Sequence, residues 1–159
     1  VTQPLDYVWD ETMAEAFRSR KQNGLIQPTL WADDDGAHMF MRSTWGAVYR
    51  SDSVDGITWS PAYRTDIPNN NSGIRAAYNN GILALCFNPV GSNWGARTPL
   101  VIEFSDDGGK TFGGRVTLES DPGEYSYPTV IPDGKGFAVS YTWKRNNIAF
   151  ARIAPDDTV

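Results

Sequence analysis

The sequence predicts an all-β fold made of about three four-stranded antiparallel β-propeller blades. The first observation is a turn string that occurs twice: residues 53–59 read Ser-Val-Asp-Gly-Ile-Thr-Trp and residues 105–112 read Ser-Asp-Asp-Gly-Gly-Lys-Thr-Phe. The second is a Pro-Thr pair followed by an Asp-Gly turn, at Pro28 and again at Pro128. Both repeats fit a period of roughly 50 residues, which is typical of a propeller blade. A β-sandwich with similar turns is the alternative.

Each turn string predicts a hairpin that is bonded to itself. Serine and aspartate side chains accept backbone N–H groups inside such turns, and glycine supplies a positive φ. The aromatic residue that ends each string, Trp59 or Phe112, is expected to anchor the return strand in the core. We therefore expect these turns to join neighbouring strands of one blade.

Three repeating units begin near Gln27, Asn71 and Tyr125, and each reads as strand, turn and strand followed by a second strand pair. Residues 23–159 are assigned to propeller blades, with no helix expected within residues 27–153. Residues 1–22 are an N-terminal segment or an incomplete blade. Within this segment, Asp10 is a candidate cap for a short helix between Trp9 and Gln22.

Composition limits the classes of partner. The 159 residues carry a net charge of −5 at pH 7, so nucleic acid is not an expected partner. No apolar stretch approaches the ~20 residues of a membrane span. The single cysteine, Cys86, is interpreted as a small buried apolar residue. Without a disulfide inside the chain, both a secreted and a cytoplasmic location stay open.

No cofactor or metal site is expected. His38 is the only histidine and lies in a predicted strand, so we assign it a structural role. The run Asp33-Asp34-Asp35-Gly36 lacks the spaced ligands of a calcium loop and is interpreted as a solvated hairpin turn.

Five strings together resemble the BNR/Asp-box sialidase-like family, whose members are often called predicted neuraminidases. The strings are residues 25–31 (LIQPTLW), 49–53 (YRSDS), 69–74 (NNNSGI), 96–100 (ARTPL) and 124–128 (EYSYP). The resemblance covers nearly the whole chain, roughly residues 23–153. It implies a six-bladed sialidase propeller about twice this length, of which this chain resembles the C-terminal half. Val1 in place of Met also suggests that an N-terminal part has been removed.

The resemblance implies site residues. Sialidases of this fold hold the substrate carboxylate with three arginines and use a tyrosine nucleophile, a glutamate that assists it and an aspartate acid/base. Arg42 matches the second arginine, Arg97 the third, and Tyr125 the nucleophile. Gln27 stands where the glutamate is expected, and it is not a base. Glu124 precedes Tyr125 directly, so their side chains are expected on opposite faces of the strand.

Four further residues are candidates for contact with a sugar. Arg75 starts an inner strand and is expected to meet an anionic sugar or to form a salt bridge with a neighbouring blade. Asn71 and Ser72 are candidate hydrogen-bond donors to sugar hydroxyls. Trp94 lies in a loop without apolar neighbours and is expected to stack on a sugar ring or to cover a blade edge.

The first interpretation is therefore part of a sialidase-like glycoside hydrolase that acts on an acidic glycan. The alternatives are a non-catalytic carbohydrate-binding propeller, or a lyase or rhamnosidase on the same scaffold. Because the acid/base blade and the carboxylate near Gln27 are missing, we expect this chain alone to be inactive. Three blades expose two apolar end faces, so we expect a homodimer or docking to the missing N-terminal blades.

Overall fold

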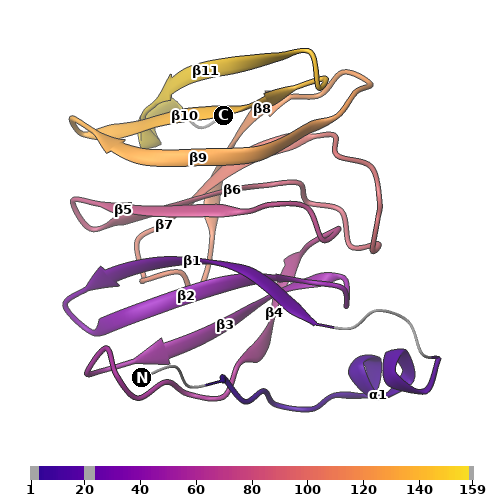
Figure 1. Ribbon diagram of the computed structural model, residues 1–159. Coiled ribbons are helices and arrows are strands. Elements are labelled where there is room, and N and C mark those ends of the chain that lie inside the picture. Colours follow the sequence, from indigo (N-terminus) through magenta and orange to yellow (C-terminus); the bar gives the residue numbers. More distant parts are fainter. Residues whose placement is uncertain (1–3, 20–23, 158–159) are drawn as a thin grey trace.

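Three antiparallel sheets are stacked one on another in chain order (Figure 1). The computed structural model describes residues 4–19 and 24–157. The first sheet contains β1 (Leu25–Asp33), β2 (Gly36–Ser43), β3 (Ala47–Ser53) and β4 (Tyr63–Pro68). The second contains β5 (Arg75–Asn79), β6 (Ile82–Phe87), β7 (Leu100–Ser105) and β8 (Gly113–Glu119), and the third contains β9 (Tyr125–Asp133), β10 (Gly136–Trp143) and β11 (Asn147–Ile153).

This architecture confirms the prediction of an all-β fold. The three sheets also begin near the residues where the three repeating units were predicted to start. Residues 27–153 contain no helix, as expected. The third sheet differs from the prediction because it has three strands rather than four among the described residues. The innermost strands are β1, β5 and β9, and β5 packs between the other two.

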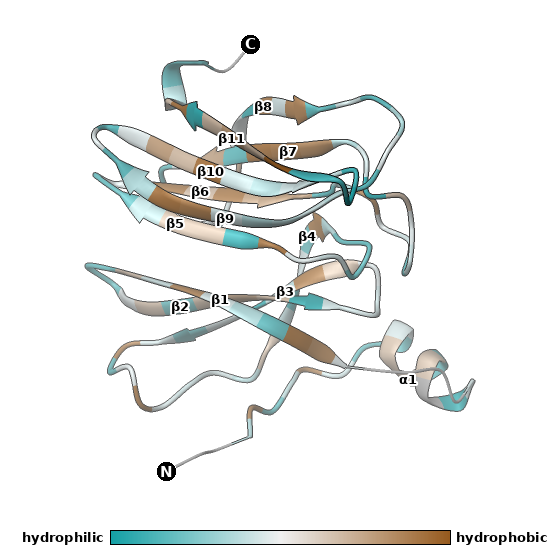
Figure 2. Cartoon of the chain, turned by 45° about the horizontal axis from the view of Figure 1, so that its top comes forward, coloured by the Kyte–Doolittle hydropathy of each residue, from teal (hydrophilic) through white to brown (hydrophobic). Residues whose placement is uncertain are grey.

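Two apolar cores hold the stack together, one in each gap between sheets. The first gap is filled by buried residues that include Trp31, Phe40 and Phe87. The second gap is filled by residues that include Ile102 and Phe137. Figure 2 shows the hydrophobic stretches of β7 and β9. Cys86 is fully buried in the second core, as the sequence predicted, and burial raises the pKa of its thiol.

The two turn strings join the third and fourth strands of the first two sheets and are bonded to themselves as predicted. In the β7–β8 turn, Asp107 Oδ1 accepts hydrogen bonds from Ser105 Oγ at 2.7 Å and from the Lys110 N–H at 2.9 Å. In the β3–β4 turn, Asp55 Oδ1 accepts from Ser53 Oγ at 3.0 Å and from the backbone N–H groups of residues 57 and 58. Local side-chain bonding therefore fixes both turns.

Two of the inner strands carry the same irregularity near their start. Pairing in β1 shifts between Ile26 and Pro28, and pairing in β9 shifts across Tyr127. Gln27 has φ 48° and Tyr127 has φ 54°, so both occupy the left-handed region immediately before a proline. A bulge of this kind turns a side chain away from the alternation of the strand.

The N-terminal segment covers the outer face of the first sheet. It contains helix α1 (Glu11–Arg18), shorter than the predicted span of residues 9–22, of which residues 20–22 lie outside the described ranges. Asp10 caps the helix as predicted, since its Oδ1 accepts the Met13 N–H at 2.9 Å. A single-turn 3-10 helix, η1 (Pro155–Asp157), follows β11. In the part of the chain that is described, no helix has the length and apolar character to cross a membrane.

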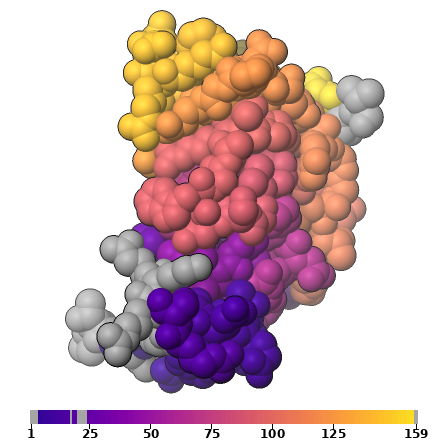
Figure 3. Space-filling view, turned by 90° about the vertical axis from the view of Figure 1, so that its right-hand side faces the viewer, coloured from indigo at the N-terminus to yellow at the C-terminus, as the bar shows by residue number. Residues whose placement is uncertain are grey.

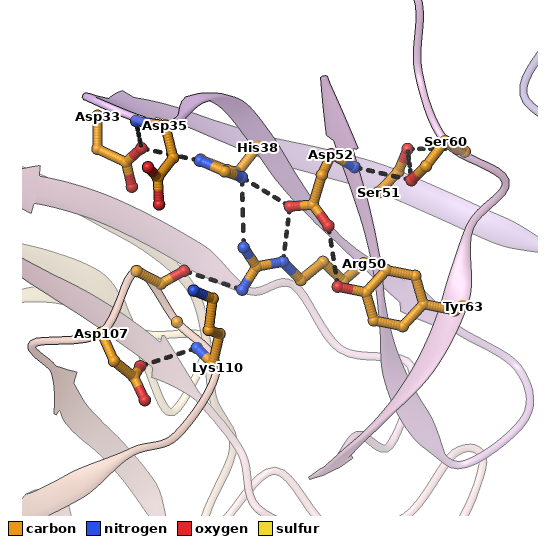
Figure 4. Close-up of polar contacts among 12 residues, drawn as sticks. Asp33, Asp35, His38, Arg50, Ser51, Asp52, Ser60, Tyr63, Asp107 and Lys110 are labelled. Carbon is orange, nitrogen blue, oxygen red and sulfur yellow. Dashed lines mark hydrogen bonds and ion pairs between the residues drawn. The ribbon is translucent and has the colours of Figure 1, made fainter. Parts of the chain in front are cut away.

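A polar cluster lies where the first sheet meets the turn of the second (Figure 4). His38 Nε2 and Nδ1 lie 2.9 Å from Asp33 Oδ1 and 2.6 Å from Asp52 Oδ1. Arg50 donates to Asp52 Oδ1 at 2.8 Å and to the Gly108 carbonyl at 2.8 Å. Burial works to raise the pKa of Asp52, but the hydrogen bonds from His38 and Arg50 outweigh it and lower that pKa. His38 therefore has the structural role expected for it.

Candidate functional site

A cavity of about 540 Å³ opens at the end of the stack where the inner strands begin. Figure 3 shows this end of the molecule, with α1 in indigo and residues of the second sheet in pink above it. Four of the predicted site residues line the cavity together: Arg42, Asn71, Trp94 and Arg97. The remaining lining residues are Gly24, Leu25, Ile26, Thr44 and Tyr127.

Arg42 is a cation that has no acidic partner among the described residues. Its Nη1 donates to the backbone carbonyl of Asn71 at 2.7 Å, which fixes the guanidinium at the end of β2. Its Nε is buried and has no hydrogen-bond partner in the described chain. Burial lowers the pKa of Arg42, and the charge of Arg97 adds to that effect. A half-buried guanidinium without a counterion among the described residues, beside a cavity, is suited to bind an anion.

Arg97 lies in the loop before β7 and is held by an acidic residue. Its Nη1 donates to Glu124 Oε1 at 2.8 Å, and Arg145 donates to the other oxygen of Glu124 at 2.8 Å. The hydrogen bond from Arg145, and then the charges of Arg97 and Arg145, lower the pKa of Glu124 against the effect of burial. Glu124 is thus an ionised carboxylate that positions two arginines, as a counterion and not as a free base.

Tyr127 is the tyrosine at this cavity. Its side chain is 45% exposed, and Arg97 Cζ lies 5.1 Å from its ring centroid. The hydrogen-bonding guanidinium of Arg97, followed by the charges of Arg97, Arg145 and Arg42, lowers the pKa of the Tyr127 phenol. Because the phenolate is favoured by neighbouring cations, Tyr127 is easier to deprotonate than an ordinary tyrosine.

Gln27 lies beside Tyr127, although it does not line the cavity. A Cβ placed on Gly73 would lie 3.5 Å from Gln27 Oε1 and 3.4 Å from Tyr127 Cδ1. The two side chains therefore both approach Gly73, just before β5. Each stands at the bulge of its own strand.

Tyr125, the tyrosine that the sequence favoured, does not reach the cavity. It is fully buried in the core between the second and third sheets, and its hydroxyl has no partner in the described chain. The prediction that Arg42, Arg97 and Tyr125 share one concave surface is therefore corrected, because the bulge in β9 directs Tyr127 to the cavity instead. Two other candidates also lie elsewhere. Ser72 is buried and donates to Asn88 Oδ1 at 2.7 Å, and Arg75 is exposed at the start of β5.

The amino-acid sequence matches the BNR repeat-like domain family over residues 1–139. The chain belongs to this family. No curated protein matches it. Among solved structures, the Hadza microbial sialidase Hz136 superposes with a TM-score of 0.70 and 18% identity, over 85% of this chain and 28% of that one.

Two structures of the NanB sialidase from Streptococcus pneumoniae are also similar. A point mutant superposes with a TM-score of 0.64 and 16% identity, over 87% of this chain and 24% of NanB. A complex with an ammonioethanesulfonate superposes with a TM-score of 0.59 and 17% identity, over 86% of this chain and 24% of NanB. This BNR repeat-like chain thus has the fold of part of a sialidase propeller and spans about a quarter of the length of these proteins.

Trp94 is the aromatic residue of the cavity rim in this BNR repeat-like chain. Its backbone has φ 60°, and its backbone N–H donates to the Asn70 carbonyl at 3.1 Å, which anchors the loop. Its side chain is 73% exposed, so it faces solvent instead of covering a blade edge.

Sequence reasoning missed Tyr127 and the contacts of Arg145. A signal for Tyr127 was present, because Tyr127-Pro128-Thr129 repeats the string Gln27-Pro28-Thr29 that was used to find the period. The residue before each proline is therefore equivalent in the two blades. No comparable repeat marks Arg145, which reaches Glu124 from the β10–β11 turn.

Proposed function

We propose that this chain provides the acidic-glycan-binding part of a sialidase-like glycoside hydrolase. The observation that carries the proposal is Arg42, whose buried Nε has no partner in the described chain and which lines one cavity together with Arg97. Removing a charge from water without a counterion is unfavourable, so an anionic ligand would stabilise this arrangement.

The chemistry of the lining suits a carboxylate. Each guanidinium presents parallel N–H donors in a fork that matches the two oxygens of a carboxylate. Asn71 adds a buried Oδ1 that has no donor among the described residues, and this oxygen is suited to accept a sugar hydroxyl. An acidic sugar satisfies both groups at once.

Tyr127 is our candidate for the nucleophile, in place of Tyr125. A neutral phenol avoids the repulsion between a substrate carboxylate and an anionic nucleophile at a neighbouring carbon. The lowered pKa of Tyr127 supports partial activation by Arg97. Tyr127 Oη would bond to the anomeric carbon as the bond from that carbon to the glycosidic oxygen breaks. The phenol proton would pass to a base, and an acid would protonate the departing oxygen. The described residues provide no carboxylate for these proton transfers, since Glu124 is held by two arginines.

A non-catalytic glycan-binding propeller is the second candidate. It is favoured by Gln27, which stands where the resemblance expects a glutamate, approaches the same glycine as Tyr127 and cannot accept a proton at neutral pH. Both candidates require the same acidic sugar in the same cavity. They differ only in whether Tyr127 reacts.

Calorimetric titration tests the binding. The probe is the methyl α-glycoside of sialic acid, with methyl galactoside as the neutral comparison. We expect Arg42→Gln to weaken binding of the acidic glycoside by about 10- to 100-fold, because it removes a charge-assisted fork. The control is Arg75→Gln, which removes an exposed arginine outside the cavity and should leave the affinity unchanged. Equal affinity for the acidic and neutral glycosides would contradict the proposal.

An assay with an aryl sialoside tests the hydrolytic candidate. We expect no turnover by this chain alone, a result that both candidates allow. Turnover that is abolished by Tyr127→Phe would establish hydrolysis and overturn the non-catalytic alternative. Retention of that turnover in Tyr127→Phe would remove Tyr127 from the chemistry.

A further inference from the structure

The turn between β10 and β11 has an unusual backbone for its sequence. Lys144 has φ 50° and Arg145 has φ 54°, so two long side chains occupy the left-handed region in succession. The Asn146 N–H donates to the Trp143 carbonyl at 3.0 Å, which closes the turn around them. Positive φ at both central residues is typical of turns that contain asparagine and glycine, and the β5–β6 turn uses Asn80-Gly81 in this way. Turn geometry alone therefore does not explain the choice of lysine and arginine.

The contacts of this turn give a reason for its backbone. The Lys144 N–H donates to the Glu124 carbonyl at 2.8 Å, so the turn is attached to the chain just before β9. Arg145 Nε donates to Glu124 Oε2 at 2.8 Å. Unfavourable backbone conformations are concentrated at functional sites, because only the surrounding contacts can hold them. The turn thus places a guanidinium on the same carboxylate that holds Arg97.

The two oxygens of Glu124 have different partners. Oε1 accepts hydrogen bonds from Arg97 Nη1 at 2.8 Å and from Ser126 Oγ at 3.3 Å, whereas Oε2 accepts from Arg145. The Arg97 side chain is 16% exposed and lines the first cavity. The Arg145 side chain is 63% exposed and does not line that cavity. Glu124 therefore separates an inner arginine that can meet a ligand from an outer arginine that meets solvent.

Glu124 and the carboxylate of a bound ligand compete for Arg97. When a ligand carboxylate takes the guanidinium of Arg97, Glu124 Oε1 loses its charged partner. An ionised carboxylate that stays partly buried without a counterion is unfavourable. The Glu124 side chain is 31% exposed, and Arg145 keeps its other oxygen paired during this exchange. Arg145 therefore makes it easier for Arg97 to change partners.

We propose that Arg145 is a positioning residue, which holds Glu124 so that Arg97 can exchange this carboxylate for that of an acidic ligand. The inference rests on the proposed function and adds to it a residue that does not itself contact the ligand. A second signal is independent of any ligand. The hydrogen bond and charge of Arg97, and then the charge of Arg145, lower the pKa of the Tyr127 phenol. Ionisation of Tyr127 therefore reports on where Arg145 lies.

Ultraviolet titration of the tyrosines tests this position. In each background, the difference between the parent and its Tyr127→Phe variant isolates the Tyr127 phenol. Arg145→Gln should raise the midpoint of Tyr127 ionisation, because a cation near the phenolate is lost, and Arg145→Lys should bring it back toward the wild-type value. Arg152→Gln is the matched control, since it removes an exposed arginine of β11 that is paired with Asp133. It should leave the midpoint unchanged.

Calorimetric titration with the methyl α-glycoside of sialic acid tests the exchange. Arg145→Gln should weaken binding by about threefold to tenfold, because Glu124 then depends on Arg97 alone for its charged partner. Adding Glu124→Gln to this variant should restore the affinity to within about twofold of the wild type, because the competing charge is gone. A purely structural role of the pair predicts the opposite, a further loss in the double variant.

The outcomes separate this inference from the proposed function. A raised Tyr127 midpoint in Arg145→Gln but not in Arg152→Gln, together with binding that Glu124→Gln restores, supports the positioning role. An unchanged midpoint in Arg145→Gln, or a double variant that binds no better than the single one, would overturn that role and leave the proposed function standing. If the wild-type chain does not bind the glycoside, the proposed function fails and the positioning role fails with it.

Discussion

The two outer faces of the stack differ in whether the chain covers them. The outer face of the first sheet carries a buried cluster that consists of Met13, Met41, Trp45, Ala47, Tyr49 and Ala62. The outer face of the third sheet exposes large apolar side chains instead. Ile131 is 54% exposed, and Ile148 and Phe150 on β11 are each 67% exposed.

Asp10 attaches the cover at the first face. Its Oδ1 accepts the Met13 N–H at the start of α1, and its Oδ2 accepts the Tyr49 hydroxyl of β3 at 3.1 Å. The backbone adds a second attachment, because the Val8 N–H donates to the Ala62 carbonyl at 2.8 Å. One carboxylate thus caps the helix and ties it to the sheet.

The difference bears on association. A ring closed from two copies through both end faces would have to displace the cover of the first sheet. The open face of the third sheet is therefore the one where we expect association.

The largest expected effect is on stability. Met13→Ala should lower the free energy of unfolding by about 2–5 kcal/mol, because it leaves a cavity in a fully buried cluster. Phe150→Ala on the open face should change the free energy of unfolding of the monomer by less than about 0.5 kcal/mol, at protein concentrations below those at which the chain associates. Urea denaturation of both variants measures the contrast. Equal losses would mean that the two faces are equally buried in solution.

Alkaline pH should weaken the covered face. Burial, together with Asp10, raises the pKa of Tyr49 to about 12. Between pH 10 and about pH 12 the unfolded chain loses this proton while the folded chain keeps it, so stability falls as pH rises. The urea midpoint should therefore fall across this range, and less steeply in Tyr49→Phe. Tyr127→Phe is the control and should keep the full slope, because the pKa of Tyr127 is lowered.

The smallest expected effect concerns self-association, which tests the open face directly. The dimer expected from the sequence stays a prediction. Light scattering should give the mass of a dimer for the wild-type chain and of a monomer for Phe150→Asp. Val54→Asp places the same charge on an exposed apolar residue of the β3–β4 turn and should remain a dimer. A wild-type monomer would contradict association through this face.

The cavity lined by Arg42 and Arg97 shows how far the sequence-based argument reaches. Arg42 and Arg97 were expected on one concave surface, and both line the cavity, because each lies at the end of a strand or in a loop at the same end of its blade. Asn71 and Trp94 line the same cavity, which was not predicted. Tyr125 was preferred because Tyr125-Ser126 matches the Tyr-Ser string of the family, and Tyr127 was not considered. Strict alternation would place both tyrosines on one face of β9, whereas the bulge separates them, and a bulge depends on how a neighbouring strand pairs.

Local chemistry let the sequence alone determine the turns and the starts of the three blades. Ser105, Asp107 and the glycines beside them satisfy one another within a few residues, so their structure does not depend on the rest of the chain. The tertiary structure alone decided which tyrosine faces the cavity, which carboxylate holds Arg97 and which end face is covered. Each of these depends on contacts between residues far apart in the chain, such as Tyr49 with Asp10, and no local pattern encodes such a pairing.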